Sequence, residues 1–539
     1  MSLLSSSQRL GVAALLLAAS NLLSRLMGLI RDKVISWQFG AGHEADMYFA
    51  AFVVPDCINY LLAGGFMSIT IIPLLSRSFQ EDPKDAWRFF SCVLCWISLA
   101  ALLLTILSML LAVPLADIVA PGFSSQQKLR LAFFMRLILP AQFFFLTGAC
   151  FTALLFLRRQ FRVPALSPLI YNGCIILGGL LLPAILLLFN PNATFQAMSQ
   201  KVGMTGYCLG VTLGAFLGAF LVPLVTARQR EMPIQICFSH PLLKRFLIIA
   251  LPLMLGQTII MLDEQFLRIF GSMLGEGIVS LLNYARRIAQ VPIGLVGQAA
   301  AVASYPFLVA LLTQGKNEEF AATLNKALRM GLCLIIPCSF GLLACAWSVI
   351  TLIFQGGRFG QAETLACVPL LQIMLLAVPL TMLYMVLVRA FYARSDTITP
   401  AVTGTIVTCV AVPVYYFLSS RIGAWAIALT SSISVSAYVL WLMFIWVHRY
   451  GNDALSGLGR LAGILLTLAI PSTYLALQSL PWLQENLTFF PLLKAFVILM
   501  LQGNLFLLLF VPPALFLVPD LRKALARRLP SFHLKNAKK

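Results

Sequence analysis

The sequence predicts an all-α polytopic membrane protein. Of its 539 residues, 60% are hydrophobic and only 11% are charged, which is more apolar surface than a soluble fold of this length can bury. The apolar residues form unbroken runs of roughly 20 or more, the length of a membrane-spanning helix. A β-barrel would instead have alternating segments of about ten residues. We therefore expect a bundle of transmembrane helices.

About fourteen apolar runs are long enough to cross a membrane. The first run contains Arg25 and Arg31 and has no small-residue cleavage site after a short apolar core, so we expect a transmembrane helix there and not a cleaved signal peptide. The predicted spans are 8–31, 45–76, 89–113, 131–156, 164–189, 203–226, 243–274, 278–312, 325–352, 365–392, 399–418, 423–447, 460–480 and 490–517.

Basic residues are distributed unevenly between the two sides of this topology. With the N-terminus inside, 24 of the 38 Lys and Arg residues fall in cytoplasmic segments and five in outer segments. This asymmetry supports an even number of spans and places both termini in the cytoplasm. Topology and contact with anionic membrane lipids then explain the net charge of +19, and we expect no nucleic-acid partner.

The chain contains an internal repeat. FGAG (39–42) and LGEG (274–277) each follow an apolar helix and precede a helix that contains a proline, and the segment 139–168 has an echo at 378–402. We therefore predict two six-helix lobes related by a pseudo-two-fold axis along the membrane normal, a plan shared by alternating-access transporters. The predicted parts are an N-lobe at 1–230, a C-lobe at 231–450, two further helices at 451–520 and a basic cytoplasmic tail at 521–539.

Four ionisable residues lie in or beside the first two predicted spans: Arg25, Arg31, Asp32 and Asp46. A charged side chain at the membrane centre costs at least about 2.5–3.5 kcal/mol on insertion scales, so such groups face a partner or a water-filled cavity. Ser24 and Arg31 are seven residues apart, as are Arg25 and Asp32, so each pair lies close to one helical face. The pattern predicts a binding site.

The sequence contains no pattern typical of a metal site or of nucleotide-driven transport. The twelve cysteines are scattered, nearly all within apolar spans, and are expected to be packing residues; Cys92 and Cys95 have CxxC spacing but no further ligands nearby. The four histidines lie far apart, so we predict no metal site. Because no nucleotide-binding or phosphorylation motif is present, transport energy is expected from an ion gradient, the membrane potential or the substrate itself.

Four motifs resemble those of one known family. SRLMGLIRDKVISWQFGAGHEADMYFAAFVVP (24–55) is similar to that family's first two helices. NYARRIAQVPIGL (283–295) is similar to its eighth helix, FYARSDTITP (391–400) to a connector and FQGGRFG (354–360) to a loop. The family is that of the MurJ (MviN-type) lipid II flippases, and the resemblance covers nearly the whole chain, with the motifs in the family's order.

This resemblance implies a fold of the multidrug/oligosaccharidyl-lipid/polysaccharide exporter superfamily, with a cationic central cavity and a lipid-facing groove made by the two helices in 451–520. The implied substrate is lipid II, an undecaprenyl-pyrophosphate-linked disaccharide-pentapeptide that is moved from the inner to the outer leaflet of the bacterial cytoplasmic membrane for peptidoglycan synthesis. We expect a monomeric transporter and not an enzyme.

Matching the motifs position by position assigns Arg25, Arg31 and Arg287 to a diphosphate clamp. Guanidinium groups suit this role because they stay charged and bind oxyanions with two parallel hydrogen bonds, which replace the water lost in the membrane. The structural alternative is a set of ion pairs between lobes that only gates the cavity. The residues expected to orient or gate the clamp are Ser24, Asp32, Asp46, Asn59, Arg286 and Gln290.

Several positions depart from the family pattern. Asn59 and Gly64 stand where the family usually has an arginine and an acid, Arg286 replaces a common Asp, and Gln290 replaces a Glu. These changes leave open a flippase or exporter of another polyprenyl-linked polysaccharide unit, or a cation-coupled antiporter. An antiporter of cationic drugs should have an acidic, aromatic cavity, whereas the charge within the spans is net basic.

A second polar site lies in the seventh predicted span. Asp263 and Glu264 either bind a coupling cation, Na⁺ or H⁺, or pair with Arg268, which is five or four residues further along the same helix. We expect the pairing. No other cofactor is predicted.

Overall fold

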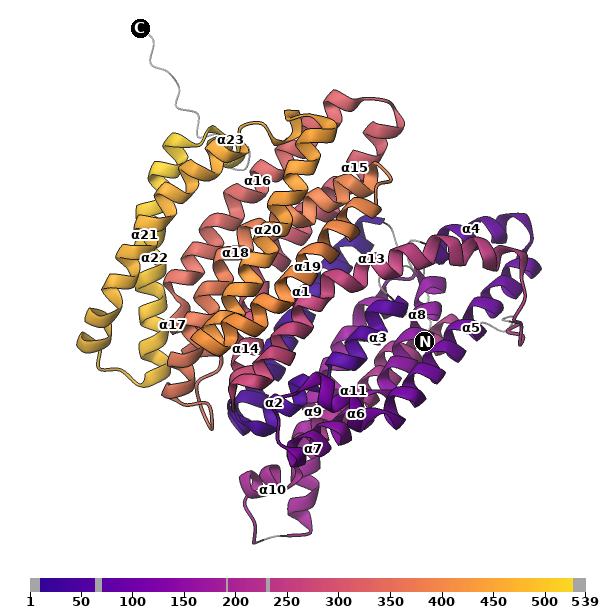
Figure 1. Ribbon diagram of the computed structural model, residues 1–539, viewed down its shortest axis with the longest axis horizontal. Helices are drawn as coiled ribbons and strands as arrows, with labels where there is room; N and C mark the ends of the chain where they lie inside the picture. Colours follow the sequence, from indigo (N-terminus) through magenta and orange to yellow (C-terminus); the bar gives the residue numbers. More distant parts are fainter. Residues whose placement is uncertain (1–9, 64–69, 191, 229–232, 527–539) are drawn as a thin grey trace. The chain divides into compact units, whose positions relative to one another are not determined.

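The computed structural model describes residues 10–63, 70–190, 192–228 and 233–526, and this part of the chain consists of helices joined by turns, without a β-strand (Figure 1). Eleven helical segments in it are long and apolar enough to cross a membrane, which confirms the predicted all-α membrane fold. Each coincides with a predicted span. They are Pro83–Leu110, Ser125–Leu157, Arg162–Leu188, Thr205–Ala227, Ile278–Thr313, Asn317–Ala344, Gln361–Ala393, Ile398–Ile422, Ala424–Tyr450, Asp453–Asn486 and Pro491–Leu517.

The other three predicted spans are not among these eleven segments. The run 8–31 begins outside the described residues and continues in α1 (Leu10–Phe39), and the run 243–274 corresponds to α13 (Pro241–Gly271). The run 45–76 is not one helix: α2 (His43–Ala50) and α3 (Val53–Ala63) are separated by a turn, next to Pro55, whose ring nitrogen cannot continue the hydrogen-bond ladder. The count of about fourteen spans stays a prediction.

Close contacts divide the chain into two compact units. Unit 1 comprises Met1–Tyr284, Phe354–Glu363 and Thr408–Ile427, and unit 2 comprises Ala285–Ile353, Thr364–Val407 and Ala428–Lys539. The predicted lobe boundaries after residues 230, 450 and 520, and the symmetry between lobes, stay predictions. Of the predicted tail, 521–526 belong to α23 (Pro519–Ala526), and 527–539 lie outside the described residues.

Unit 1 is held together by close helix packing. Its α9 (Arg162–Leu188) packs against both α1 and α11 (Thr205–Gly214), and glycines permit the second contact, because a Cβ added at Gly206 would overlap the Gly178 carbonyl. The remaining elements are α4 (Ile72–Glu81), α5 (Pro83–Leu110), α6 (Ala112–Val119), α7 (Ser125–Ile138), α8 (Pro140–Leu157), α10 (Phe195–Val202), the π-helical η2 (Ala215–Leu221) and α12 (Val222–Ala227), followed by α13, η3 (Ser272–Leu274), the start of α14 (Ile278–Pro292) and parts of α18 (Gln361–Ala393), α19 (Ile398–Ile422) and α20 (Ala424–Tyr450).

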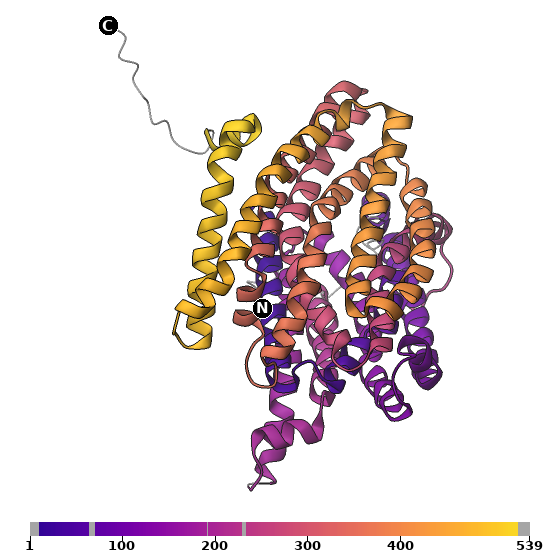
Figure 2. The same ribbon diagram turned by 60° about the vertical axis from the view of Figure 1, so that its left-hand side comes forward.

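Unit 2 contains the other long helices. In both views α21 (Leu458–Asn486) and α22 (Pro491–Leu517) lie side by side as an antiparallel pair, and α21 packs against α16 (Asn317–Ala344) (Figure 1, Figure 2). Its elements after α14 are η4 (Ile293–Gly297), α15 (Gln298–Thr313), α16 (Asn317–Ala344), α17 (Ala346–Ile353), α18 (Gln361–Ala393), parts of α19 (Ile398–Ile422) and α20 (Ala424–Tyr450), η5 (Asp453–Leu455), α21 (Leu458–Asn486), α22 (Pro491–Leu517) and α23.

Candidate functional site

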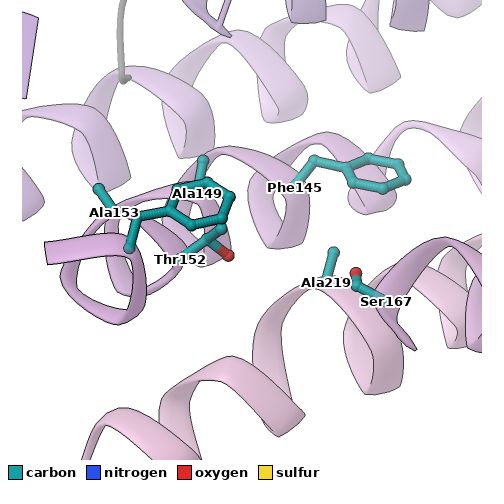
Figure 3. A pocket seen from close by; sticks show the side chains of 7 residues that line it. Phe145, Ala149, Thr152, Ala153, Ser167 and Ala219 are labelled. Atoms are coloured by element: carbon teal, nitrogen blue, oxygen red, sulfur yellow. The ribbon is translucent and has the colours of Figure 1, made fainter. Parts of the chain in front are cut away.

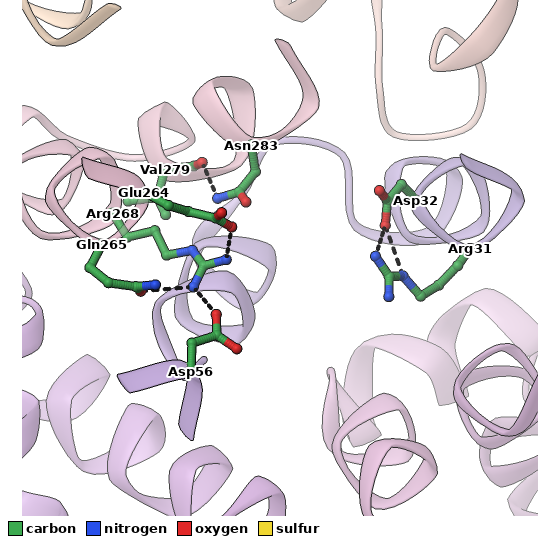
Figure 4. A network of polar contacts seen from close by, with 8 residues as sticks. All are labelled: Arg31, Asp32, Asp56, Glu264, Gln265, Arg268, Val279 and Asn283. Carbon is green, nitrogen blue, oxygen red and sulfur yellow. Dashed lines mark hydrogen bonds and ion pairs between the residues drawn. The ribbon is translucent and has the colours of Figure 1, made fainter. Parts of the chain in front are cut away.

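Arg31 and its neighbour Asp32 form a buried ion pair on α1 (Figure 4). The Nε and Nη2 atoms of Arg31 donate to the same carboxylate oxygen, Oδ1, at 2.9 and 2.8 Å. A third donor, Nη1, lies 3.3 Å from Oδ1 of Asn172 on α9. The two side chains of the ion pair are only 11% and 3% exposed. An apolar helix therefore carries a guanidinium whose charge is balanced by the adjacent carboxylate.

Ser24 and Arg25 lie on α1 about two turns before Arg31 and Asp32, and both are half-buried. The helix is continuous from Leu10 to Phe39. The predicted seven-residue spacing thus holds in the structure: Ser24 lies on the stripe of Arg31, and Arg25 on the stripe of Asp32. Two neighbouring polar stripes follow one apolar helix.

The FQGGRFG segment (354–360) folds onto the C-terminal end of α1. Lys33 Nζ donates to the Gln355 carbonyl at 2.7 Å, and the backbone N–H of Arg358 donates to the Trp37 carbonyl at 3.0 Å. The intervening Gly357 has φ +60°, and an added Cβ would overlap the Trp37 carbonyl. This motif therefore fixes the end of the helix that carries Arg31.

Asp46 caps the start of α14. Its carboxylate accepts from the backbone N–H of Gly277 at 2.6 Å, and from the N–H and hydroxyl of Ser280 at 2.7 and 2.5 Å. A carboxylate suits this position because the first N–H groups of a helix lack internal partners and carry a partial positive charge. His43 adds a contact to Glu276, with its Nε2 atom 2.9 Å from the Oε2 atom of the carboxylate. The two repeat-related turns, FGAG and LGEG, thus meet in unit 1.

Arg268 on α13 is the centre of a second buried network (Figure 4). It donates to Asp56 of α3 and to Glu264 of its own helix, each at 2.8 Å, and to Gln265 Oε1 at 3.0 Å. Its side chain is 8% exposed, while those of Asp56 and Glu264 are 26% and 22% exposed. The expected pairing of Glu264 with Arg268 is therefore present.

Asp263 has a different contact. Its Oδ1 atom accepts from the Tyr415 hydroxyl of α19 at 2.8 Å, and the Tyr415 ring stacks on Phe270 with centroids 5.2 Å apart. With Asp56, Asp263, Glu264 and Arg268 ionised, this part of unit 1 holds three negative charges and one positive charge. Its role as a cation site stays a prediction.

The other predicted residues are placed as follows. Asn59 is half-buried on α3, about one turn after Asp56, and Gly64 lies outside the described residues. Arg286, Arg287 and Gln290 are half-buried on α14 and belong to unit 2, whereas Arg25 and Arg31 belong to unit 1. The three-arginine clamp stays a prediction.

The polar residues of these networks that the sequence interpretation missed include Asp56, Asn172 and Tyr415. Asp56 was detectable, because it is an acid that directly follows Pro55 in an apolar helix. Asn172 and Tyr415 gave no comparable signal, since neutral polar residues recur in most spans and only the packing of α9 and α19 reveals their partners.

Among the described residues, no group of three or more His, Cys, Asp or Glu side chains is arranged to hold a metal ion. A pocket of about 190 Å³ lies among α8, α9 and η2 (Figure 3). It is lined by Phe145, Ala149, Thr152, Ala153, Phe156, Ser167 and Ala219, none of them ionisable, so it does not suit an anionic headgroup.

Known proteins resemble the chain over most of its length. The family profile described as "Lipid II flippase MurJ" matches residues 35–497. A "Probable lipid II flippase MurJ" of Rhizobium meliloti (strain 1021) is 28% identical over 440 residues, which cover 80% of this chain and 79% of the relative. A "Lipid II flippase MurJ" of Burkholderia cenocepacia is 27% identical over 450 residues, which cover 81% and 84% of the two chains.

Solved structures share the fold. "Lipid II flippase MurJ, inward closed conformation" superposes with a TM-score of 0.74 at 24% identity and covers 94% of this chain and all of that one. An inward-facing multidrug resistance MATE family transporter of the MOP superfamily gives a TM-score of 0.65 at 16% identity, covering 81% of this chain and 99% of the other. Because the family profile spans most of the sequence, the chain belongs to the lipid II flippase MurJ family.

Proposed function

We propose that this protein is a flippase that moves lipid II from the inner to the outer leaflet of the bacterial cytoplasmic membrane by alternating access. The observation that carries the proposal is the family match over residues 35–497. Arg25 and Arg31 precede the matched segment, so their roles rest on their motif and on the burial of Arg31. We also propose cytoplasmic termini, a monomer and contacts between its basic inner surface and anionic lipids.

The chemistry of the buried arginines supports a diphosphate ligand. An unpaired diphosphate would lose its hydration in the membrane at a prohibitive cost, whereas a fixed guanidinium replaces water with charge-assisted hydrogen bonds. Arg31 is paired with Asp32 in the structure. We propose that the diphosphate displaces Asp32 and is then held by Arg25, Arg31 and Arg287, so that substrate binding itself shifts the equilibrium between conformations.

The Asp46 cap supplies a closure that must open during the cycle. Its hydrogen bonds join α2 to the start of α14, next to the His43–Glu276 pair. We assign this contact to the outer end of the pathway, because the predicted topology places residues 40–46 and 274–280 outside. Release of the headgroup to the outer leaflet would separate the two turns.

We also propose that the Arg268 network couples transport to a cation. Asp56 and Glu264 share the Arg268 guanidinium, and Asp263, which accepts from Tyr415, precedes Glu264 on the same helix, so one bound proton or Na⁺ would reduce the excess negative charge of this partly buried group of acids. Transport by the Asp263→Asn variant tests this: its rate should no longer depend on the pH or Na⁺ gradient. If the gradient dependence is unchanged, the coupling site lies elsewhere or the membrane potential alone drives transport.

Complementation tests the proposed function. A bacterium depleted of its own lipid II flippase should grow, and expose lipid II on its outer leaflet, when this chain is expressed. Arg25→Ala, Arg31→Ala and Arg287→Ala should each abolish rescue at normal protein levels. Arg77→Ala is the matched control, because Arg77 is 69% exposed in a surface pair with Glu81. Failure of the parent chain to rescue would refute the function, and rescue by all three variants would refute the clamp.

A further inference from the structure

Asn172 contacts Nη1, the guanidinium nitrogen of Arg31 that does not donate to Asp32. Asp32 Oδ1 accepts from Nε and Nη2, whereas Asn172 Oδ1 accepts from Nη1. The Nε–Nη2 edge is one that can bind an oxyanion with two parallel hydrogen bonds. We propose that Asn172 is a positioning residue that directs this edge of Arg31 toward the substrate diphosphate, an inference that rests on the proposed function.

The orientation of the Asn172 amide is fixed by a second hydrogen bond. Its Nδ2 atom donates to the Pro168 carbonyl, one turn earlier on α9, at 2.9 Å. The residue is 7% exposed. Because a carbonyl can accept but not donate, the amide nitrogen must face Pro168, and the amide oxygen therefore faces Arg31. A flip of the amide would lose both hydrogen bonds.

The two partners of Arg31 differ in charge, and this difference assigns their roles. Asp32 is anionic, so it both neutralises Arg31 and competes with a phosphate for the same edge. Asn172 is neutral, so it holds Nη1 without reducing the charge available to the substrate. When the diphosphate displaces Asp32, the hydrogen bond to Asn172 persists and keeps the guanidinium from rotating. Through Asn172, α9 thereby holds the Arg31 side chain of α1 in an orientation that can bind the diphosphate.

Binding of lipid II to the purified full-length chain in nanodiscs of zwitterionic phospholipid tests the proposal. Asn172→Ala should raise the Kd roughly 3- to 10-fold, because the hydrogen bond that orients Arg31 is lost while the contacts of Arg31 with the diphosphate remain. Asn172→Asp should raise it further, because a second carboxylate would compete with the diphosphate for Arg31. If Asn172→Ala does not fold, Asn172→Gln keeps the amide but displaces its oxygen, and should also weaken binding.

Asn190→Ala provides the matched control. Asn190 follows α9 and makes the same kind of hydrogen bond, from Nδ2 to the Leu186 carbonyl four residues earlier at 3.1 Å, but it is exposed. This variant should bind lipid II like the parent. A similar loss of affinity in Asn190→Ala and Asn172→Ala would assign the effect to α9 stability and overturn the proposal.

A double-mutant cycle separates positioning from a structural role. If Asn172 acts through Arg31, the Arg31→Ala/Asn172→Ala double variant should bind no more weakly than Arg31→Ala alone. Additive losses would overturn the proposal, as would an unchanged Kd for both Asn172→Ala and Asn172→Asp. Normal binding by Arg31→Ala would instead refute the clamp in the proposed function, so the two failures are distinguishable.

Discussion

The Asp46 carboxylate accepts two hydrogen bonds from Ser280, one from its backbone N–H at 2.7 Å and one from its hydroxyl at 2.5 Å. These residues are 234 positions apart in the sequence. They belong to the two segments that follow the turns FGAG and LGEG, so the contact joins parts that the predicted internal repeat makes equivalent.

Asp46→Asn should weaken this contact. The amide has nearly the same volume, but it removes the charge opposite the start of α14 and directs an N–H₂ group at other donors. We expect a loss of roughly 1.5–3 kcal/mol of conformational stability, as for a hydrogen bond to a charged group, and a loss of rescue. Ser280→Ala removes only the hydroxyl and keeps both backbone hydrogen bonds to the carboxylate, so it should cost less than Asp46→Asn. Thermal unfolding in detergent measures both, and equal stability of Asp46→Asn and the parent would contradict the cap.

Gly277→Ala should disrupt the contact between the same two turns by a steric clash. Gly277 has φ +83°, and a Cβ there would overlap the Ala41 carbonyl. Gly275→Ala is a matched control, because Gly275 has φ +116° but no atom within 4 Å of an added Cβ. The two variants share backbone strain of about 1–3 kcal/mol. Only Gly277→Ala should also disrupt the contact, so it should have the lower unfolding temperature; the reverse order would argue against the packing of these turns.

Arg268→Ala should be strongly destabilising. It leaves the partly buried carboxylates of Asp56 and Glu264 without their guanidinium, and the loss should approach the roughly 3–5 kcal/mol that is typical of a fully buried pair. The double variant Arg268→Ala/Asp56→Asn should recover part of this loss, because one of the two charges disappears with its partner. Unfolding temperatures of the single and double variants provide the measurement. No recovery in the double variant would mean that Asp56 and Arg268 are not energetically coupled.

Substitution of Arg394 in unit 2 should have a smaller effect on stability. Its guanidinium carbon lies 4.3 Å from the ring centroid of Tyr450, 5.0 Å from that of Phe320 and 5.7 Å from that of Trp446. Arg394→Leu should cost about 0.5–2 kcal/mol through lost cation–π interactions, while Arg394→Lys retains part of them. Unfolding temperatures should rank parent, Lys and Leu in that order. A Leu variant as stable as the parent would exclude a stabilising role for the aromatic cage.

The sequence was sufficient for the fold class and for eleven of the spans, because uninterrupted apolar runs specify transmembrane helices with little ambiguity. It was not sufficient for the break between α2 and α3, where hydropathy continues across the turn and only Pro55 hints at an interruption. Hydropathy measures burial in lipid and is insensitive to helix breaks that lie inside protein.

For the site, the sequence located the ionisable residues but not their partners. Arg31, Asp32 and the Glu264–Arg268 pair could be predicted, since the first two are buried charges and the last has helical i, i+4 spacing. The cap formed by Asp46 could not be predicted, because it depends on a contact between distant segments. The role of Asn172 could not be predicted for the same reason.

The proposed mechanism depends on intramembrane guanidinium groups that hold a lipid diphosphate. The most direct measurement is the Kd of undecaprenyl diphosphate, which lacks the sugar and peptide, for the parent chain and for Arg31→Ala in nanodiscs. We predict at least a tenfold weaker affinity for the variant, as expected for the loss of a bidentate charge-assisted contact. Equal affinities of the two folded proteins would contradict this mechanism.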